Sequence, residues 1–169
     1  CLMSEFQLSI YQEINKDDKK LNKSSSDATN FAFPIIENNK IIPKTGYKGK
    51  LRLINDLFRD QKGYNELLSN FLNLKTPNYN LLVPDFENKK YFFGEILTSK
   101  YLNNFSSKYY QCLKHIEGLI NDNVRPIFIY SNAVEIGINL FSHILLQNGF
   151  LEFKGDEDTT NTKINNDTV

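Results

Sequence analysis

The fold class is decided by the stretch Arg125-Pro-Ile-Phe-Ile-Tyr-Ser-Asn-Ala-Val-Glu-Ile-Gly-Ile-Asn-Leu-Phe-Ser-His-Ile-Leu-Leu-Gln-Asn-Gly-Phe-Leu-Glu-Phe153. Its first apolar run, Ile127–Tyr130, is rich in β-favouring residues and predicts a buried strand over 126–131. Apolar residues then recur at helical spacing, which predicts a helix over about 133–148, followed by a second strand over 150–153. A strand-helix-strand unit places its two strands parallel in one sheet, so the stretch predicts an α/β fold.

Polar residues mark both ends of the predicted helix. Ser131 and Asn132 follow the strand and belong to the residue types that cap helix N-termini, while Asn148 and Gly149 are typical of a helix stop. Ligands bind at the carboxyl ends of strands in open α/β sheets, and helix N-termini attract anions. Ser131 and Asn132 are therefore candidate contacts for a nucleic-acid phosphate, with plain helix capping as the alternative interpretation.

Upstream of this unit the patterns predict three further helices. One spans 107–121 with Ser106 or Ser107 as its cap, and two shorter helices span about 51–58 and 64–72. The remaining interpretations are a half-buried strand over 5–11, a compact aromatic segment over 30–34 that Pro34 ends, loops over 16–27, 40–49 and 75–85, and a short strand or buried loop over 91–93.

The chain of 169 residues divides into three predicted regions. Residues 1–100 form an irregular α+β connector with two short helices, residues 101–153 form the α/β unit, and residues 154–169 form a disordered polar tail. Apolar residues make up 40% of the sequence, which is enough for a sizeable core.

Charge and cysteine content exclude several classes of protein. The formal net charge is zero, which argues against a strongly basic protein that coats nucleic acid. Cys1 and Cys112 cannot form a disulfide framework, so a reducing compartment, the cytoplasm or a virion, is expected. The sequence has neither an apolar run of about 18 residues nor a signal-peptide pattern, so no membrane partner is expected.

Four short strings resemble one family of proteins. They are Ser26-Asp-Ala-Thr-Asn-Phe-Ala-Phe-Pro34, Ser106-Ser-Lys-Tyr-Tyr110, Ile127-Phe-Ile-Tyr-Ser-Asn-Ala-Val-Glu-Ile-Gly-Ile138 and Leu145-Leu-Gln-Asn-Gly-Phe150. Together they resemble the superfamily-two helicases, or nucleoside triphosphatases, of large DNA viruses, including the poxvirus early-transcription type. In that family the third string contains the fourth helicase motif and opens the second RecA-like domain. The first string resembles the connector between the two domains, with Asp27 where arginine is common.

The resemblance implies a partial RecA-like, P-loop NTPase-type parallel sheet with flanking helices. It also implies ATP and Mg²⁺ as cofactors of a full-length parent, nucleic acid as its substrate, and transcription-machinery proteins as partners. This chain has no G-x-x-x-x-G-K-S/T loop and no acidic box for magnesium, so it is expected to hold no cofactor and to be inactive alone. Both ends look cut, so the chain is expected to be a fragment of an ATP-dependent helicase or translocase.

Other candidate residues have ordinary structural explanations. Glu135 suits the first turn of the predicted helix through the helix dipole, and Gly137 is expected to permit close packing. His115 and His143 lack metal-ligand spacing, and Cys112 is expected to be a small core residue. No catalytic residue and no metal ligand is therefore assigned.

Two alternative functions compete with the helicase fragment. A non-catalytic α/β protein-interaction module would use residues 105–153 as a docking domain. A Rossmann-like transferase would bind a nucleotide at the first turn, but Ser131-Asn-Ala-Val134 lacks the glycines that such a turn requires.

Overall fold

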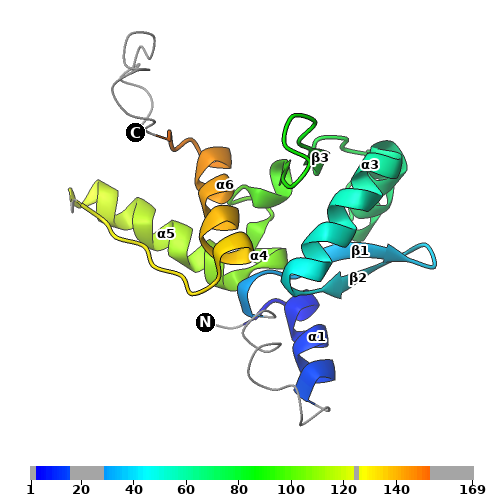
Figure 1. Cartoon of the computed structure of the whole chain (residues 1–169), viewed down its shortest axis with the longest axis horizontal. Coiled ribbons are helices and arrows are strands. Elements are labelled where there is room, and N and C mark those ends of the chain that lie inside the picture. Colours follow the sequence, from blue (N-terminus) through cyan, green and yellow to red (C-terminus); the bar gives the residue numbers. More distant parts are fainter. Residues whose placement is uncertain (1–2, 16–28, 124–125, 153–169) are drawn as a thin grey trace.

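The computed structural model describes residues 3–15, 29–123 and 126–152. Figure 1 shows the hairpin of β1 (Phe33–Glu37) and β2 (Lys40–Lys44) and the long helix α3 (Gly46–Phe71) on one side of the molecule. Helices α5 (Ser107–Asn121) and α6 (Asn139–Gln147) lie on the other side, and α1 (Glu5–Asn15) lies below. One hydrophobic core contains side chains from both sides of residue 100, from Phe31 before β1 to Ile144 in α6. The loop predicted over 16–27 and the tail predicted over 154–169 lie outside the described residues.

The N-terminal segment is the helix α1, Glu5–Asn15, so the strand predicted over 5–11 is wrong. The Ser4 hydroxyl accepts a hydrogen bond from the Gln7 backbone N–H, which starts the helix. Phe6 and Ile10 are separated by one helical turn as well as by two strand periods, so the alternation was ambiguous. The Phe6 ring packs on Phe105 with ring centroids 5.7 Å apart, which fixes the helical face.

Strands β1, Phe33–Glu37, and β2, Lys40–Lys44, form an antiparallel hairpin. Asn38 and Asn39 make the two-residue turn, both with positive φ, as in the turns that match the twist of a hairpin. The loop predicted over 40–49 is therefore wrong. The prediction that Pro34 ends the aromatic segment is also wrong, because Pro34 lies within β1. Pro34 faces Pro43 one pair beyond Ile35 and Ile42, which exchange hydrogen bonds, so neither proline needs an N–H within the hairpin.

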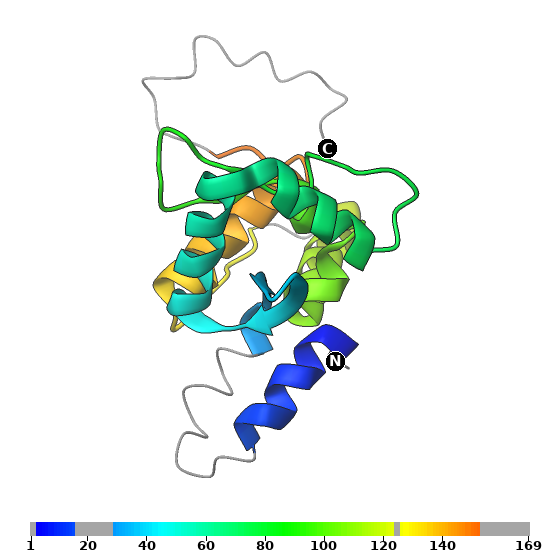
Figure 2. The ribbon, with the colours of Figure 1, turned by 90° about the vertical axis from the view of Figure 1, so that its right-hand side faces the viewer.

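Helix α3, Gly46–Phe71, contains the short helix predicted over 51–58 and all but the last residue of the one predicted over 64–72. Asp60 has non-helical dihedral angles and bends the helix, as Figure 2 shows. Its carboxylate accepts the Gly63 backbone N–H at 2.9 Å and so caps the second half of the helix. A Cβ at Gly63 would lie 2.3 Å from the same carboxylate, so a larger residue here would displace the Asp60 side chain from its capping position.

The segment after α3 is fixed to that helix by hydrogen bonds from the buried Asn65 side chain. Residues 75–85 are mostly irregular, as predicted, and Val83–Pro84 (β3) pairs with Phe92–Phe93 (β4), which confirms the short strand at 91–93. The fully buried Asn65 side chain donates to the backbone oxygens of Tyr79 and Leu82 and accepts the Leu82 N–H.

The helices η2, Glu95–Leu97, and α4, Leu102–Phe105, lead into α5, Ser107–Asn121, which has the predicted bounds. Ser106 caps α5 by accepting the Tyr109 N–H at 3.1 Å, as predicted, and its hydroxyl donates to the Asn30 carbonyl. The Gln7 side chain accepts the Ser107 N–H at 2.9 Å, so α1 also supports this helix start.

The C-terminal segment contains a π-helical turn, η3 (Val134–Ile138), continued by α6 (Asn139–Gln147). Together they confirm the helix predicted over about 133–148 and its stop at Asn148. Helix α6 contacts α5 through the rings of Phe141 and Tyr109. The strands predicted over 126–131 and 150–153 are absent from the described residues, and Phe153 lies outside them. A strand needs a partner, and no other described segment pairs with 126–131, so the parallel sheet stays a prediction.

We expect replacement of Asn65 by leucine to lower the free energy of unfolding by about 3–5 kcal/mol. Leucine fills a similar volume but leaves the buried Leu82 N–H and carbonyl without partners, and each such group costs about 1–3 kcal/mol. Urea unfolding measures the change. The control is Asn55→Leu on the exposed face of the same helix, where we expect less than about 1 kcal/mol. Equal effects of the two variants would contradict the role of Asn65.

Candidate functional site

Ser131 and Asn132 form the turn that precedes η3, but neither caps the helix. The Ser131 hydroxyl accepts the Ala133 N–H at 3.2 Å and donates to the Ala133 carbonyl at 3.0 Å. Ala133 occupies the cap position and has no side-chain hydrogen bond there, so the capping interpretation is wrong. Serine competes for nearby backbone groups in this way at turns. Asn132 is exposed, so its amide is accessible to a ligand.

Gly137 allows this turn to fold back on the helix. A Cβ at position 137 would lie 2.2 Å from the Ser131 Oγ and 3.1 Å from the Ala133 Cβ. Gly137 is therefore closely packed, as expected. It packs against the turn that contains Ser131 and Ala133. Replacement of this glycine by a larger residue would force the Ser131 side chain to move.

The first helical turn is wider than an α-helix, and a tyrosine from α5 supports it. The Ile138 N–H bonds to the Ala133 carbonyl at 3.1 Å, which is the five-residue spacing of a π-helix. The Tyr109 hydroxyl donates to the Ile136 carbonyl at 2.6 Å, and its ring packs on Phe141. Burial raises the pKa of Tyr109 above its ordinary value, so the hydroxyl keeps the proton that it donates.

The buried Lys50 ammonium joins the first turn of η3 to α3 through an ion pair. The Lys50 side chain is 2% exposed, and its ammonium donates to the Glu135 carboxylate at 3.0 Å. The ammonium also lies 4.5 Å from the centroid of the Tyr91 ring. Glu135 was expected to suit the helix dipole, and its ion pair with Lys50, 85 positions away, had no signal in the sequence.

His143 on α6 completes this group of side chains. Its ring packs on Tyr91 and Phe93, with ring centroids 4.5 and 5.2 Å apart. Burial, and then the Lys50 ammonium, lower the pKa of His143, so the imidazole stays neutral at neutral pH. We call Lys50, Tyr91, Glu135 and His143 the lysine cluster.

The lysine cluster positions the turn but offers no catalytic arrangement. Within the described ranges, no three His, Cys, Asp or Glu side chains come together as metal ligands would.

His115 and Cys112 are exposed on α5, so the core position expected for Cys112 is wrong. In the part of the chain that the structure describes, no helix is long and apolar enough to span a bilayer.

An exposed apolar strip runs up to the same turn. Phe128 and Tyr130 are 92% and 88% exposed, and Ile129 and Val134 are also exposed. Large exposed apolar patches on folded proteins generally mark interaction surfaces. These four side chains therefore form a candidate interaction surface. The first turn of η3 is therefore held by contacts with α3 and α5, while the apolar segment that precedes it is exposed among the described residues.

Comparison with known proteins found similarity to a viral protein whose name describes it as a helicase. Over 179 aligned residues, the chain is 31% identical to a protein of Acanthamoeba polyphaga mimivirus named "Putative ATP-dependent RNA helicase". The alignment covers 99% of this chain but only 15% of the relative, so the chain spans a small part of that protein's length. No family model and no solved structure matches the chain.

We expect Glu135→Gln to lower the free energy of unfolding by about 2–3 kcal/mol, because it leaves the buried Lys50 ammonium without a carboxylate. Adding Lys50→Met should recover most of this loss, since methionine fills the site without a charge. Urea unfolding of the single and double variants measures both effects.

The control is the exposed pair Lys114 and Glu117, whose charged atoms lie 2.7 Å apart on α5. Glu117→Gln should cost less than about 1 kcal/mol, as is usual for surface ion pairs. A cost for Glu135→Gln no larger than that of Glu117→Gln would show that the buried pair does not hold η3 in place.

Proposed function

We propose that this chain is part of an ATP-dependent helicase or translocase of a large DNA virus. In this proposal residues 1–100 connect two RecA-like domains, and residues 101–153 open the second one. The whole-length similarity to the mimivirus protein supports the proposal, as does that protein's name. ATP and Mg²⁺ would bind to parts of the protein outside this chain, because the chain lacks a phosphate-binding loop.

The exposed apolar strip is the observation that carries the domain proposal. Ile127–Tyr130 is β-favouring and apolar, yet it has no pairing partner among the described residues. The helix that follows is formed and packs on α5. Further strands from the rest of a RecA-like domain would pair with this segment and cover its side chains.

Ser131 and Asn132 would then lie at the carboxyl end of that strand, where we propose they contact the nucleic-acid backbone. The exposed Asn132 amide donates to a phosphate oxygen, and the Ser131 hydroxyl keeps the turn folded through Ala133. The Glu135 charge beside the turn is offset by Lys50, which reduces its repulsion of a phosphate.

We expect hydrogen exchange to distinguish the isolated chain from the polypeptide of the complete reading frame. The amides of residues 127–130 should exchange rapidly in the 169-residue chain and become strongly protected in the complete protein. The amides of α5, which is packed in both, provide the control.

Two other outcomes are informative. Rapid exchange at 127–130 in the complete protein would contradict the RecA-like sheet. Protection that appears only when a different protein is added would instead support the interaction module, because the same apolar strip would then be a docking surface.

We expect Asn132→Ala in the complete protein to weaken binding of single-stranded nucleic acid by about 5–30-fold, equivalent to about 1–2 kcal/mol for a lost bond to a charged group. The double change of Ser131 and Asn132 to alanine should weaken it further and also reduce thermal stability, because Ala133 loses its partner. ATP affinity should change less than nucleic-acid affinity. Fluorescence anisotropy measures the first and nucleotide titration the second.

The control removes two exposed amides elsewhere, at Asn103 and Asn104 on α4, and should leave binding unchanged. If Asn132→Ala melts and binds as the unaltered protein does, the site assignment is wrong and the turn has only a structural role.

A further inference from the structure

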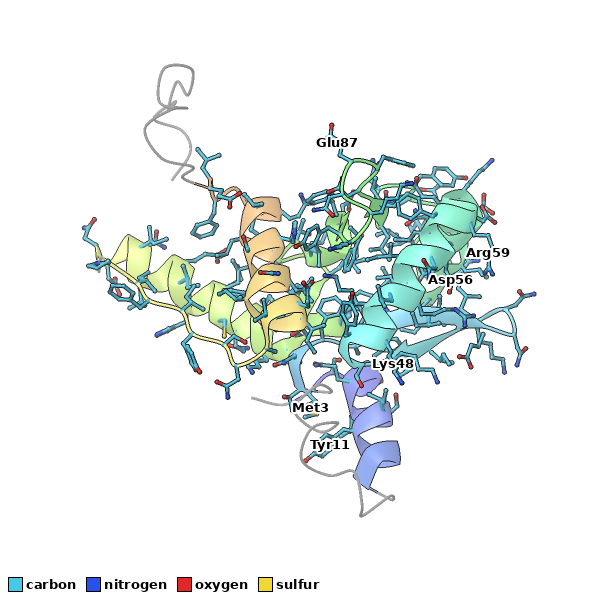
Figure 3. The ribbon with its side chains drawn as sticks, viewed as in Figure 1. Met3, Tyr11, Lys48, Asp56, Arg59 and Glu87 are labelled. Carbon is cyan, nitrogen blue, oxygen red and sulfur yellow. The ribbon has the colours of Figure 1, made fainter. Side chains whose placement is uncertain are left out.

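Helix α3 presents a row of basic and amide side chains to solvent. Lys48, Arg52, Asn55 and Arg59 follow one another at intervals of four, three and four residues, which places them on one face of the helix. All four are exposed, and Figure 3 shows Lys48 and Arg59 toward opposite ends of this part of α3. We call these four residues the basic row. At the rise of an α-helix it is about 16 Å long.

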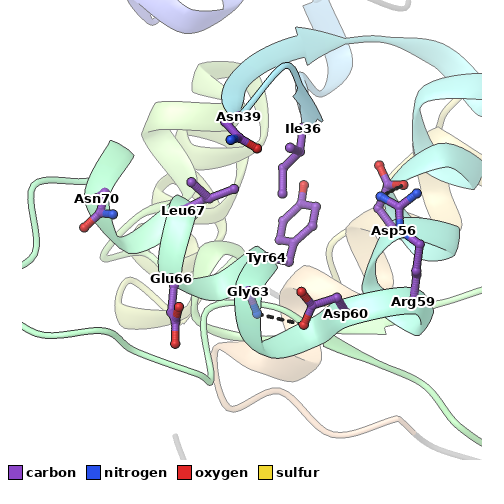
Figure 4. Close-up of a pocket in the computed structure, with 10 residues that line it drawn as sticks. All are labelled: Ile36, Asn39, Asp56, Arg59, Asp60, Gly63, Tyr64, Glu66, Leu67 and Asn70. Carbon is purple, nitrogen blue, oxygen red and sulfur yellow. Dashed lines mark hydrogen bonds and ion pairs between the residues drawn. The ribbon is translucent and has the colours of Figure 1, made fainter.

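One buried carboxylate positions both arginines of the row. The Asp56 side chain is 4% exposed and lies 3.1 Å from the Arg52 Nε and 3.2 Å from an Arg59 Nη. Figure 4 shows the Arg59 side chain lying along the helix toward Asp56. Each guanidinium contacts the carboxylate through one nitrogen, so its other N–H groups can donate to a ligand. Two positive charges share one negative charge, so this part of the surface stays positive and is ordered before a ligand arrives.

Two exposed phenylalanines lie beside the basic row. The ring of Phe58, the residue before Arg59, packs edge-on against Phe86, with ring centroids 5.6 Å apart. Phe86 is 68% exposed, so most of its ring is accessible to a ligand. The loop over 85–90 carries two acidic and two basic residues and adds no net charge beside the row. Figure 3 shows Glu87 of this loop pointing away from α3.

Cations in a row with an exposed ring beside them indicate the kind of ligand. Regularly spaced cations suit the phosphates of a nucleic-acid backbone, and exposed aromatic rings suit unpaired bases, which stack on them. An acidic peptide would pair with the cations but has no base to place on Phe86. A duplex keeps its bases stacked on one another. Single-stranded nucleic acid carries both kinds of group in one chain.

We propose that the basic row and Phe86 form a binding site for single-stranded nucleic acid. Phosphates of the strand contact the three cations of the row, the Asn55 amide donates to a phosphate oxygen, and a base stacks on Phe86. This site goes beyond the proposed function, which places the nucleic-acid contact at the turn before η3. Its charges and rings support it without any contribution from that turn.

Fluorescence anisotropy of the 169-residue chain with a labelled oligothymidylate tests the row. Three phosphate contacts give a slope of about −2 in log affinity against log salt, so doubling the salt concentration should weaken binding about fourfold. Lys48→Gln with Arg59→Gln should weaken binding at least about tenfold and reduce the slope to about −0.7. Asp56 keeps Arg52 as its partner in this variant, so the melting temperature should not change.

The matched control is Lys75→Gln with Lys114→Gln, which removes the same formal charge. Lys75 is exposed after the end of α3, and Lys114 lies on α5 at the other side of the molecule. This variant should bind as the unaltered chain does. Lys48→Gln alone provides a second measurement that cannot disturb Asp56, because Lys48 has no ion pair among the described residues, and it should lower the slope by about 0.7.

Phe86→Ala tests the aromatic part of the site. It should weaken binding of oligothymidylate by about fivefold or more, because a stacking surface is lost. The salt slope should not change, because no charge is removed. The control is Phe128→Ala, at another exposed phenylalanine, which should bind as the unaltered chain does.

A titration with polyglutamate separates nucleic acid from an acidic partner protein. Polyglutamate should bind more weakly than oligothymidylate and should not respond to Phe86→Ala. Polyglutamate binding of equal strength would overturn the proposal, as would unchanged oligothymidylate binding in the row variant or in Phe86→Ala. None of these variants changes the turn before η3, so failure here leaves the hydrogen-exchange test of the proposed function intact.

Discussion

The buried ammonium of Lys50 is the constraint that orders the C-terminal half of the molecule. A charge with a side chain 2% exposed must keep a counter-charge within reach, and Glu135 supplies it from the first turn of η3. That single requirement places η3 against α3, and the Tyr109 hydroxyl secures the same turn from α5. The position of Ser131 and Asn132 follows from these two contacts, because Gly137 brings the turn against the helix that they hold.

Helices were predictable because their signals are local. The period of apolar residues and the capping serine gave the bounds of α5 to the residue, and both halves of α3 were found although its bend at Asp60 was not. Strand predictions were less successful: the short strand at 91–93 was found, but residues 5–11 form a helix and the strand Lys40–Lys44 was missed. The physical reason is that strand formation depends on a partner elsewhere in the chain. Ile127–Tyr130 has the composition of a strand but no partner among the described residues, whereas Lys40–Lys44 was interpreted as a loop and pairs with β1. Its two-asparagine turn between isoleucine-rich segments was the signal that could have revealed the hairpin.

The site was only partly predictable from sequence. Ser131, Asn132 and Gly137 lie close together in the chain, so their proximity could be expected. The ion pair of Glu135 with Lys50 could not, because the partners lie in segments whose relative placement depends on packing of the whole core. The contact between Phe58 and Phe86 is equally invisible in a sequence, since the second ring comes from a loop whose path depends on the same packing.

The facing prolines of the hairpin give its two open edges a distinct chemical character. In an antiparallel pair, residues that do not bond to each other direct their backbone groups outward, so Pro34 and Pro43 each remove one outward donor. Each edge then keeps a single outward N–H within the paired region, at Ile36 or Ile41, and resists the addition of another strand. Ile127–Tyr130 has no proline within it and no such protection. Any growth of β-structure, whether in assembly or in aggregation, would therefore be directed to the C-terminal segment and away from the hairpin.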